Sequence, residues 1–218
     1  MSGGETGFSS VVLDVDSTLC GIEGIDWLAS RRDPATGAAI TALTDQAMRG
    51  KIALDSVYGQ RLAAVRPSRR DVDALAAAYV GALAPGAAEA VRALRAAARH
   101  VVLVSGGLRE AILPLSALLG IAESDVHAVS VRLTGSGSYD GYDAASPLAT
   151  ATGKRAVVEA LALPRRILAV GDGATDLAIR PAVDAFAAFT GFVRREPVVA
   201  AADHVIDSFA QLVELVLS

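Results

Sequence analysis

Three short apolar runs along the chain share one pattern. VVL ends just before Asp14, VVLV just before Ser105, and ILAV just before Gly171 and Asp172. The runs are rich in β-branched residues and continuously apolar, which is typical of parallel strands that are covered on both faces. Polar or glycine-rich residues follow each run, so the pattern predicts three buried strands whose carboxyl ends carry polar side chains.

The segments between these runs have the periodicity of helices. Helices are expected over residues 86–99, 108–119, 154–161 and 208–217, with Pro85 in the first turn of the first helix and Pro114 able to kink the second. Shorter strands are expected over 126–129, 185–188 and 204–206, and residues 134–147 are rich in turn formers, which predicts a hairpin or loop. This alternation predicts an α/β fold with a doubly wound, Rossmann-like parallel sheet.

The stretch between the first strand and Pro85 differs from the rest, because it has helical patterns and little strand signal. It is too long for an ordinary connection between a strand and a helix. We therefore expect a core domain formed by residues 1–18 and 85–218, and a small helical cap formed by residues 19–84 that folds over the ends of the strands.

Composition and charge exclude several classes of protein. Of the 218 residues, 52% are hydrophobic and 20% charged, so a packed globular fold is expected. Net charge is −4 and no run of Lys and Arg exceeds a pair, which argues against a nucleic-acid partner; pairs such as Arg194 and Arg195 are expected at solvated helix ends. No apolar window predicts a membrane span.

The single cysteine, Cys20, excludes an internal disulfide framework, and the first residues do not resemble a signal peptide. A cytoplasmic location is the expectation that follows. Cys20 has no histidine partner along the chain that would activate it, so we interpret it as a small buried residue.

If the three apolar runs are neighbouring strands, five polar side chains meet at one edge of the sheet: Asp14, Asp16, Ser105, Asp172 and Asp176. Four carboxylates in one crevice require cations. An all-oxygen site favours Mg²⁺, and the three scattered histidines (His100, His127 and His204) do not form a zinc site. Lys154, at the start of a predicted helix, can supply a second positive charge.

These residue types suit the transfer of a phosphoryl group. A carboxylate can attack phosphorus only when the repulsion between the two anions is screened, as Mg²⁺ and a lysine would do. Asp14 and Asp16 fit the roles of nucleophile and of proton donor and acceptor. Ser105, with the backbone amides of Gly106 and Gly107, can donate to phosphate oxygens. Each motif alone also fits a simple turn or helix cap, and it is their occurrence at three strand ends that favours a site.

The order of the motifs resembles the haloacid dehalogenase superfamily of phosphohydrolases, and within it the phosphoserine phosphatases. DVDST resembles the first motif of that family, VSGG the second, Gly153 with Lys154 the third, and GDGATDL the fourth. The resemblance covers most of the chain. It implies an enzyme that hydrolyses a phosphomonoester with Mg²⁺ through an aspartyl-phosphate, most closely O-phospho-L-serine to L-serine in serine biosynthesis.

The resemblance also implies a role for each matching residue. Asp14 would be the nucleophile and Asp16 the general acid and base, while Ser105, Gly106, Gly107 and Lys154 would hold the phosphoryl group. Mg²⁺ would be bound by the Asp14 side chain, the backbone carbonyl of Asp16 and Asp172, with Asp176 beside them or in direct contact.

Three further residues are implied for the substrate. Glu23 would bind the amino group, Arg61 the carboxylate, and Met48 would line the same pocket. An amino acid carries one charge of each sign, so this pair is chemically sensible. Three positions depart from the usual family pattern, since Leu54, Leu108 and Trp27 stand where other residues are common.

Two other functions use the same residues. A phosphotransferase would pass the phosphoryl group from Asp14 to an alcohol such as homoserine, and a phospho-ligand sensor would bind without turnover. The four residues Asp14, Asp16, Lys154 and Asp172 argue against a sensor, because a sensor needs no nucleophile. The partner expected in every case is a small phosphorylated molecule, and the chain is expected to be a monomer or homodimer.

Overall fold

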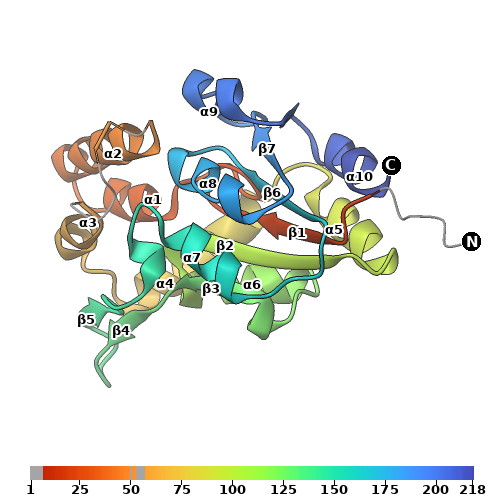
Figure 1. The fold of residues 1–218 in the computed structure, drawn as a ribbon. Helices are drawn as coiled ribbons and strands as arrows, with labels where there is room; N and C mark the ends of the chain where they lie inside the picture. The colour runs from red at the N-terminus through yellow and green to blue at the C-terminus, as the bar shows by residue number, and fades with distance from the viewer. Residues whose placement is uncertain (1–6, 50, 53–56) are drawn as a thin grey trace, which may run out of the picture.

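A six-stranded parallel sheet forms the centre of the molecule in the computed structural model, which describes residues 7–49, 51–52 and 57–218 (Figure 1). Its spatial order is β3-β2-β1-β6-β7-β8. The strands are β1 (Ser10–Leu13), β2 (His100–Leu108), β3 (Val126–Val129), β6 (Ile167–Gly171), β7 (Ala185–Phe189) and β8 (His204–Ile206). All residues of β1, β6 and β7 are buried, as their continuous apolar sequences predict. The predicted doubly wound α/β fold is confirmed.

Helices flank this sheet between successive strands. They are α5 (Ala87–Ala96), α6 (Arg109–Leu118), α7 (Gly153–Ala160), α8 (Ala174–Leu177), α9 (Glu196–Ala201) and α10 (Phe209–Leu217), with short 3-10 turns at Glu123–Asp125, Pro147–Ala149 and Arg180–Ala182. The four long helices predicted here are present. The first begins at Ala87 instead of residue 86, because Gly86 has a φ of +76° and therefore lies outside the helix as its N-cap.

In the described part of the chain, four further helices form an insertion between β1 and α5. They are α1 (Gly24–Ser30), α2 (Pro34–Met48), α3 (Tyr58–Val65) and α4 (Arg69–Gly81), and we call them the helical insertion. Asp33 caps α2 by accepting hydrogen bonds from two backbone amides, and Ser68 with Asp71 forms a capping box at α4. α4 packs against α6, whereas α1, α2 and α3 gather at one side of the molecule in Figure 1.

The two linkers of the helical insertion lie side by side. The amide of Gly21 donates to the carbonyl of Ala82 (2.8 Å), and the amide of Ala84 donates to the carbonyl of Leu19 (2.9 Å). Cys20, in the first linker, pairs with Leu83 in the second. It is fully buried, as predicted for this cysteine. The chain therefore leaves and re-enters the sheet layer at one place, close to the carboxyl end of β1.

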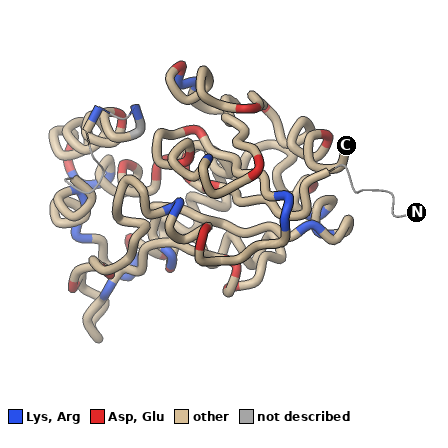
Figure 2. The backbone as a smooth tube through the Cα atoms, viewed as in Figure 1, with Lys and Arg blue, Asp and Glu red and all other residues tan. Residues whose placement is uncertain are grey.

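The predicted hairpin is also present, as β4 (Val131–Leu133) and β5 (Tyr139–Tyr142). It lies next to α3 and α4 in Figure 1. Basic and acidic residues are mixed over the described part of the chain, as Figure 2 shows, in keeping with the absence of a basic run from the sequence. None of the described helices is both long enough and apolar enough to cross a membrane.

Candidate active site

The carboxyl ends of β2, β1 and β6 bring the predicted residues together. Asp14 directly follows β1, Asp172 directly follows β6, and Ser105 lies in the last part of β2. The three strands are adjacent and parallel, and the amide of Asp14 donates to the carbonyl of Val170 (3.0 Å). Sequence positions more than 150 residues apart thereby meet at one edge of the sheet.

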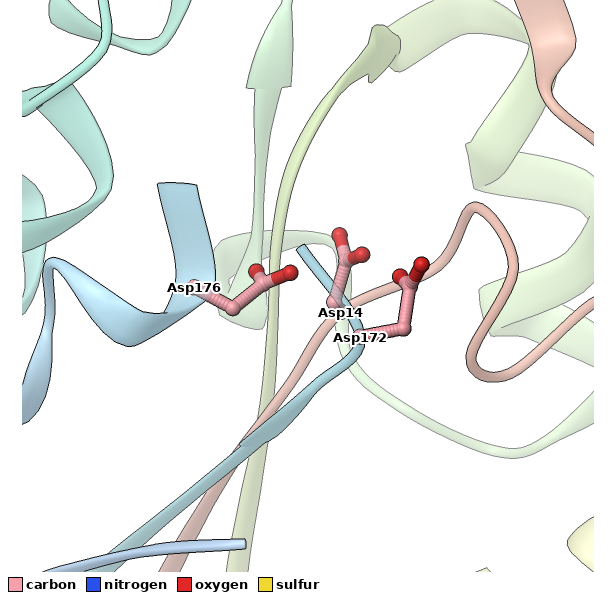
Figure 3. A group of neighbouring side chains, drawn as sticks. All are labelled: Asp14, Asp172 and Asp176. Carbon is pink, nitrogen blue, oxygen red and sulfur yellow. The ribbon is translucent and has the colours of Figure 1, made fainter. Parts of the chain in front are cut away.

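Three carboxylates form a compact cluster at this edge. Oxygens of Asp14, Asp172 and Asp176 lie within 4.8 Å of one another, and all three residues are buried (Figure 3). Burial is the largest cause that raises the pKa of Asp14, and the neighbouring carboxylate of Asp176 raises it further. Hard oxygen donors at this spacing fit Mg²⁺, whose positive charge would offset the repulsion.

Lys154 provides one positive charge inside the cluster. Its ammonium donates to Asp14 Oδ1 (2.5 Å) and to Asp176 Oδ1 (2.6 Å), and only 5% of the residue is exposed. Burial lowers the pKa of Lys154, but Asp14 and Asp176 outweigh that effect and raise it above the ordinary range. Lys154 therefore stays charged, and the structure places it at the predicted edge.

Asp16 lies in different surroundings from Asp14. Its Oδ1 accepts hydrogen bonds from the amide of Gly24 (2.8 Å) and the hydroxyl of Tyr79 (2.7 Å). Burial raises the pKa of Asp16, while these two donors lower it by a smaller amount. A carboxyl group with a raised pKa and one fixed oxygen suits proton donation through the other oxygen.

Ser105 and the two glycines after it differ from the expectation in one respect. The sequence predicts that the amides of Gly106 and Gly107 are free for a phosphate, at the start of a helix. β2 instead continues to Leu108, and the amide of Gly107 donates to Ser105 Oγ (2.9 Å). Because the amide of Gly107 already donates to Ser105, it is not free for an external acceptor such as a phosphate oxygen. It stabilises the local backbone instead.

Glu23 and Arg61 reach the same cavity as the aspartates. Burial is the main cause that raises the pKa of Glu23 to about 7, and its Oε1 accepts from the hydroxyl of Ser17 (2.8 Å). Arg61 is 3% exposed and pairs with Asp26 (3.0 Å), while its Nε has no hydrogen-bond partner among the described residues. The two side chains that were predicted to bind opposite charges of a substrate thus border one space.

The cavity encloses about 30 Å³, which is room for roughly two water molecules. Its lining combines carboxylates, two cations and a few apolar groups: Asp14, Asp16, Glu23, Ile25, Tyr58, Arg61, Gly106, Leu148, Thr150, Lys154, Asp172 and Thr175.

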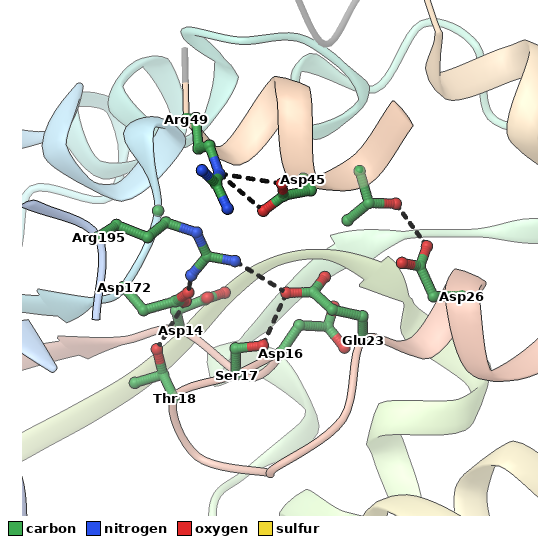
Figure 4. A network of polar contacts seen from close by, with 12 residues as sticks. Asp14, Asp16, Ser17, Thr18, Glu23, Asp26, Asp45, Arg49, Asp172 and Arg195 are labelled. Carbon is green, nitrogen blue, oxygen red and sulfur yellow. Dashed lines mark hydrogen bonds and ion pairs between the residues drawn. The ribbon is translucent and has the colours of Figure 1, made fainter. Parts of the chain in front are cut away.

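Arg195 corrects one prediction. It was expected with Arg194 at a solvated helix end, yet it is only 8% exposed and its guanidinium pairs with Asp172 (Figure 4). A second nitrogen lies 3.9 Å from Glu23 Oε1. Arg195 can be buried here because the two acids beside it compensate part of its charge.

Other residues of the site were not predicted from the sequence. Thr18 donates to Asp172 Oδ1 (3.2 Å), Asp26 holds Arg61, and Tyr58 and Tyr79 contact the residues around Asp16 and Gly106. The only signal for Thr18 was its place within DVDST. The tyrosines lie on helices of the insertion, and their role depends on packing that periodicity does not specify.

Four further positions singled out in the sequence are Met48, Leu54, Leu108 and Trp27. Met48 is the last residue of α2, but its side chain is outside the described part of the chain, as is all of Leu54. Leu108 is fully buried at the end of β2. Trp27 is half-buried in α1, with the guanidinium of Arg31 4.7 Å from the centre of its ring. Neither Leu108 nor Trp27 lines the cavity.

Curated relatives match almost the whole chain. Phosphoserine phosphatase of Bos taurus is 36% identical over 206 residues, which cover 93% of this chain and 91% of the relative. The chloroplastic phosphoserine phosphatase of Arabidopsis thaliana is 35% identical over 209 residues, covering 94% of this chain and 70% of the relative.

A solved structure has the same architecture. A phosphoserine phosphohydrolase-like protein from Francisella tularensis superposes with a TM-score of 0.88 at 25% identity, covering 95% of this chain and 99% of the other. The sequence model of the haloacid dehalogenase-like hydrolases matches residues 11–180, a range that contains the carboxyl ends of β1, β2 and β6. With its order of motifs and its convergent aspartates, this chain belongs to the haloacid dehalogenase-like hydrolase family.

Proposed function

We propose that this protein is a phosphoserine phosphatase that hydrolyses O-phospho-L-serine to L-serine and phosphate with Mg²⁺. The observation that carries the proposal is that Glu23 and Arg61 line the same cavity as Asp14. A carboxylate and a guanidinium match the ammonium and carboxylate of an amino acid, and Asp14 is within the same space to meet its phosphate. The names of the curated relatives support the same substrate.

The reaction begins at Asp14. Its carboxylate attacks phosphorus and the bond to the serine oxygen breaks, which forms an aspartyl-phosphate. Asp16 donates a proton to the leaving oxygen, for which its raised pKa is suited. Asp16 then takes a proton from water, and the resulting hydroxide releases phosphate from Asp14.

Lys154 and Ser105 hold the phosphoryl oxygens in this scheme. The ammonium of Lys154 already contacts Asp14, so it lies where negative charge accumulates between nucleophile and phosphate. Mg²⁺ would be held by the Asp14 side chain, the Asp16 carbonyl and Asp172, with Asp176 nearby, and it would neutralise charge on the nucleophile and phosphate.

The helical insertion acts as a cap in this proposal, with residues 19–84 as its extent. Glu23, Tyr58 and Arg61 come from the insertion or its first linker, whereas Asp14, Lys154 and Asp172 come from the sheet layer. Movement of the insertion about its paired linkers would admit the substrate and then exclude bulk water. The cytoplasmic location and the monomeric or dimeric state stay predictions.

The test compares three phosphomonoesters. We expect kcat/KM for O-phospho-L-serine to exceed that for phosphoethanolamine, which lacks the carboxylate, and 2-carboxyethyl phosphate, which lacks the amino group, by about a hundredfold each. Arg61→Gln should reduce the first preference and Glu23→Gln the second, because each variant removes one charge partner. Arg92→Gln, on an exposed arginine paired with Glu89, is the matched control. Equal kcat/KM for all three esters would overturn the substrate assignment.

A further inference from the structure

We infer that Tyr58 is a positioning residue that couples the helical insertion to the phosphate-binding serine, Ser105. This inference rests on the proposed function, since it concerns how the same site is assembled. Tyr58 opens α3, is 2% exposed and lines the cavity. Its hydroxyl donates to the backbone carbonyl of Gly106 (2.7 Å), which joins the insertion to β2 directly beside Ser105.

The hydrogen bond from Tyr58 fixes the orientation of the whole peptide group between Gly106 and Gly107. The carbonyl of Gly106 and the amide of Gly107 belong to one planar peptide group, so they point in opposite directions and turn together. That amide donates to Ser105 Oγ (2.9 Å). The peptide is therefore held at one end by Tyr58 and at the other by Ser105.

This arrangement sets what the Ser105 hydroxyl can do. A hydroxyl that accepts a hydrogen bond from the amide of Gly107 keeps its own proton for donation to another oxygen, such as one of a phosphoryl group. Two consecutive glycines have wide backbone freedom, so the peptide between them needs an external contact to keep one orientation. Tyr58 provides that contact when α3 lies over the cavity.

The ring of Tyr58 is itself held in place. It packs against the ring of Tyr142 in β5, with centroids 5.4 Å apart and planes tilted by 58°. A β-carbon on the neighbouring Gly59 would lie 2.8 Å from the hydroxyl of Tyr142, so glycine at that position permits the hairpin to approach α3. Contacts with both the hairpin and β2 therefore set the position of Tyr58.

The same helix also carries Arg61, one turn after Tyr58. Closure of α3 would place the arginine beside the substrate carboxylate and the tyrosine hydroxyl against Gly106 in a single movement. Recognition of the amino acid part of the substrate is thereby linked to the orientation of the serine that holds its phosphate.

Tyr58→Phe removes only the hydroxyl and is the test variant. We expect kcat/KM for O-phospho-L-serine to fall about fivefold, the typical effect of one lost hydrogen bond. Inhibition by inorganic phosphate should weaken by a similar factor, because Ser105 binds the phosphate. The matched control is Tyr139→Phe, which loses a hydroxyl from β5, where the ring lies against Arg66 and not in the cavity; its kinetics should stay within about twofold of wild type.

A double-mutant cycle with Ser105→Ala separates positioning from a general structural effect. If Tyr58 acts through Ser105, adding Tyr58→Phe to Ser105→Ala should change kcat/KM less than about twofold. Thermal unfolding of all four proteins checks that they remain folded. Full additivity, or wild-type kinetics in Tyr58→Phe, would overturn the inference; a wild type that does not hydrolyse phosphoserine would instead overturn the proposed function.

Discussion

Asp14 and Asp16 are separated by one residue, yet their carboxylates face different partners. Asp14 contacts Lys154 and lies in a cluster of acids, whereas Asp16 accepts from the amide of Gly24 and the hydroxyl of Tyr79. In the proposed mechanism, these surroundings suit Asp14 to be the nucleophile and Asp16 to be the proton donor. The donors and the cation beside these carboxylates offset part of the cost of placing the two acids so close together.

Glu23 gives a pH-dependent prediction. Burial, with Asp16 as the next cause, raises its pKa to about 7, compared with 4.5 for an ordinary glutamate. The folded protein therefore retains a proton that the unfolded chain releases between these values, so this group makes the free energy of unfolding decrease as pH rises from 4.5 to 7. Glu23→Gln cannot release this proton, so its decrease in the free energy of unfolding from pH 4.5 to above 7 should be smaller by about 3 kcal/mol.

Urea denaturation of both proteins across this pH range measures that difference. Glu89→Gln is the control, because Glu89 lies on the exposed surface. If the free energy of unfolding changed with pH in the same way for wild type and Glu23→Gln, the Glu23 carboxylate would not titrate near neutrality in the folded protein.

Single residues also show what the sequence could and could not predict. Asp14, Ser105, Lys154 and Asp172 were predictable because each lies at or next to the end of an apolar run or helix that the sequence pattern identifies. Arg195 could not be predicted, because it lies in a loop after β7 that carries no motif. Its burial depends on how that loop meets Asp172 and Glu23.

At the scale of elements, the start of α7 determines where Lys154 lies. Gly153 is its first residue, and a β-carbon there would be 1.6 Å from the carbonyl oxygen of Pro147. Only glycine permits the helix to begin this close to the preceding turn. The position of the Lys154 ammonium beside Asp14 therefore depends on the absence of a side chain one residue earlier.

Gly153→Ala should lower kcat for phosphoserine by about a hundredfold, since a displacement near 1 Å at a catalytic group is enough for such a loss. Gly135→Ala in the tip of the β4–β5 hairpin is the matched control, because a β-carbon there meets nothing within 4 Å. Steady-state kinetics of the two variants provide the comparison. Equal activity would mean that the start of α7 adapts without moving Lys154.

Strands and helices with local sequence signals were predictable, whereas features that depend on long-range contacts were not. Strands such as β3 and β8 were expected at the residues where they occur, because short β-branched runs between turns are local signals. The continuation of β2 through Gly106 and Gly107 was not expected, since it depends on long-range pairing of Leu108 with Val129 of β3, beyond a register shift that starts at Val104. The helices of the insertion were likewise expected, but the packing of α4 on α6 is set by tertiary contacts.

At the scale of the whole molecule, negative charge accumulates where the insertion meets the sheet. Among the described residues, four carboxylates line the cavity, from Asp14, Asp16, Glu23 and Asp172, and Asp176 lies beside them. Three cations compensate these five acids in part: Arg61 and Lys154 in the lining, and Arg195 through its pairs with Asp172 and Glu23. This imbalance favours a divalent cation. The overall charge of −4 is modest, so the effect comes from placement rather than from composition.

Removal of the metal should therefore abolish turnover. We expect protein treated with a chelator to lose at least about a hundredfold in phosphate release, and added Mg²⁺ to restore it. Mg²⁺ should also raise the thermal unfolding midpoint of wild type, because a ligand that binds only the folded state stabilises it. Asp172→Asn should show a smaller rise, and full activity in the presence of chelator would contradict a metal-dependent site.

In the proposed function, Asp14 accepts the phosphoryl group of phosphoserine. Phosphate release from O-phospho-L-serine with Mg²⁺, measured side by side for wild type and Asp14→Asn, tests it most directly. We expect rapid release by wild type and a loss of at least about a thousandfold in Asp14→Asn, with the variant still folded. Release by Asp14→Asn at a rate close to that of wild type would contradict it.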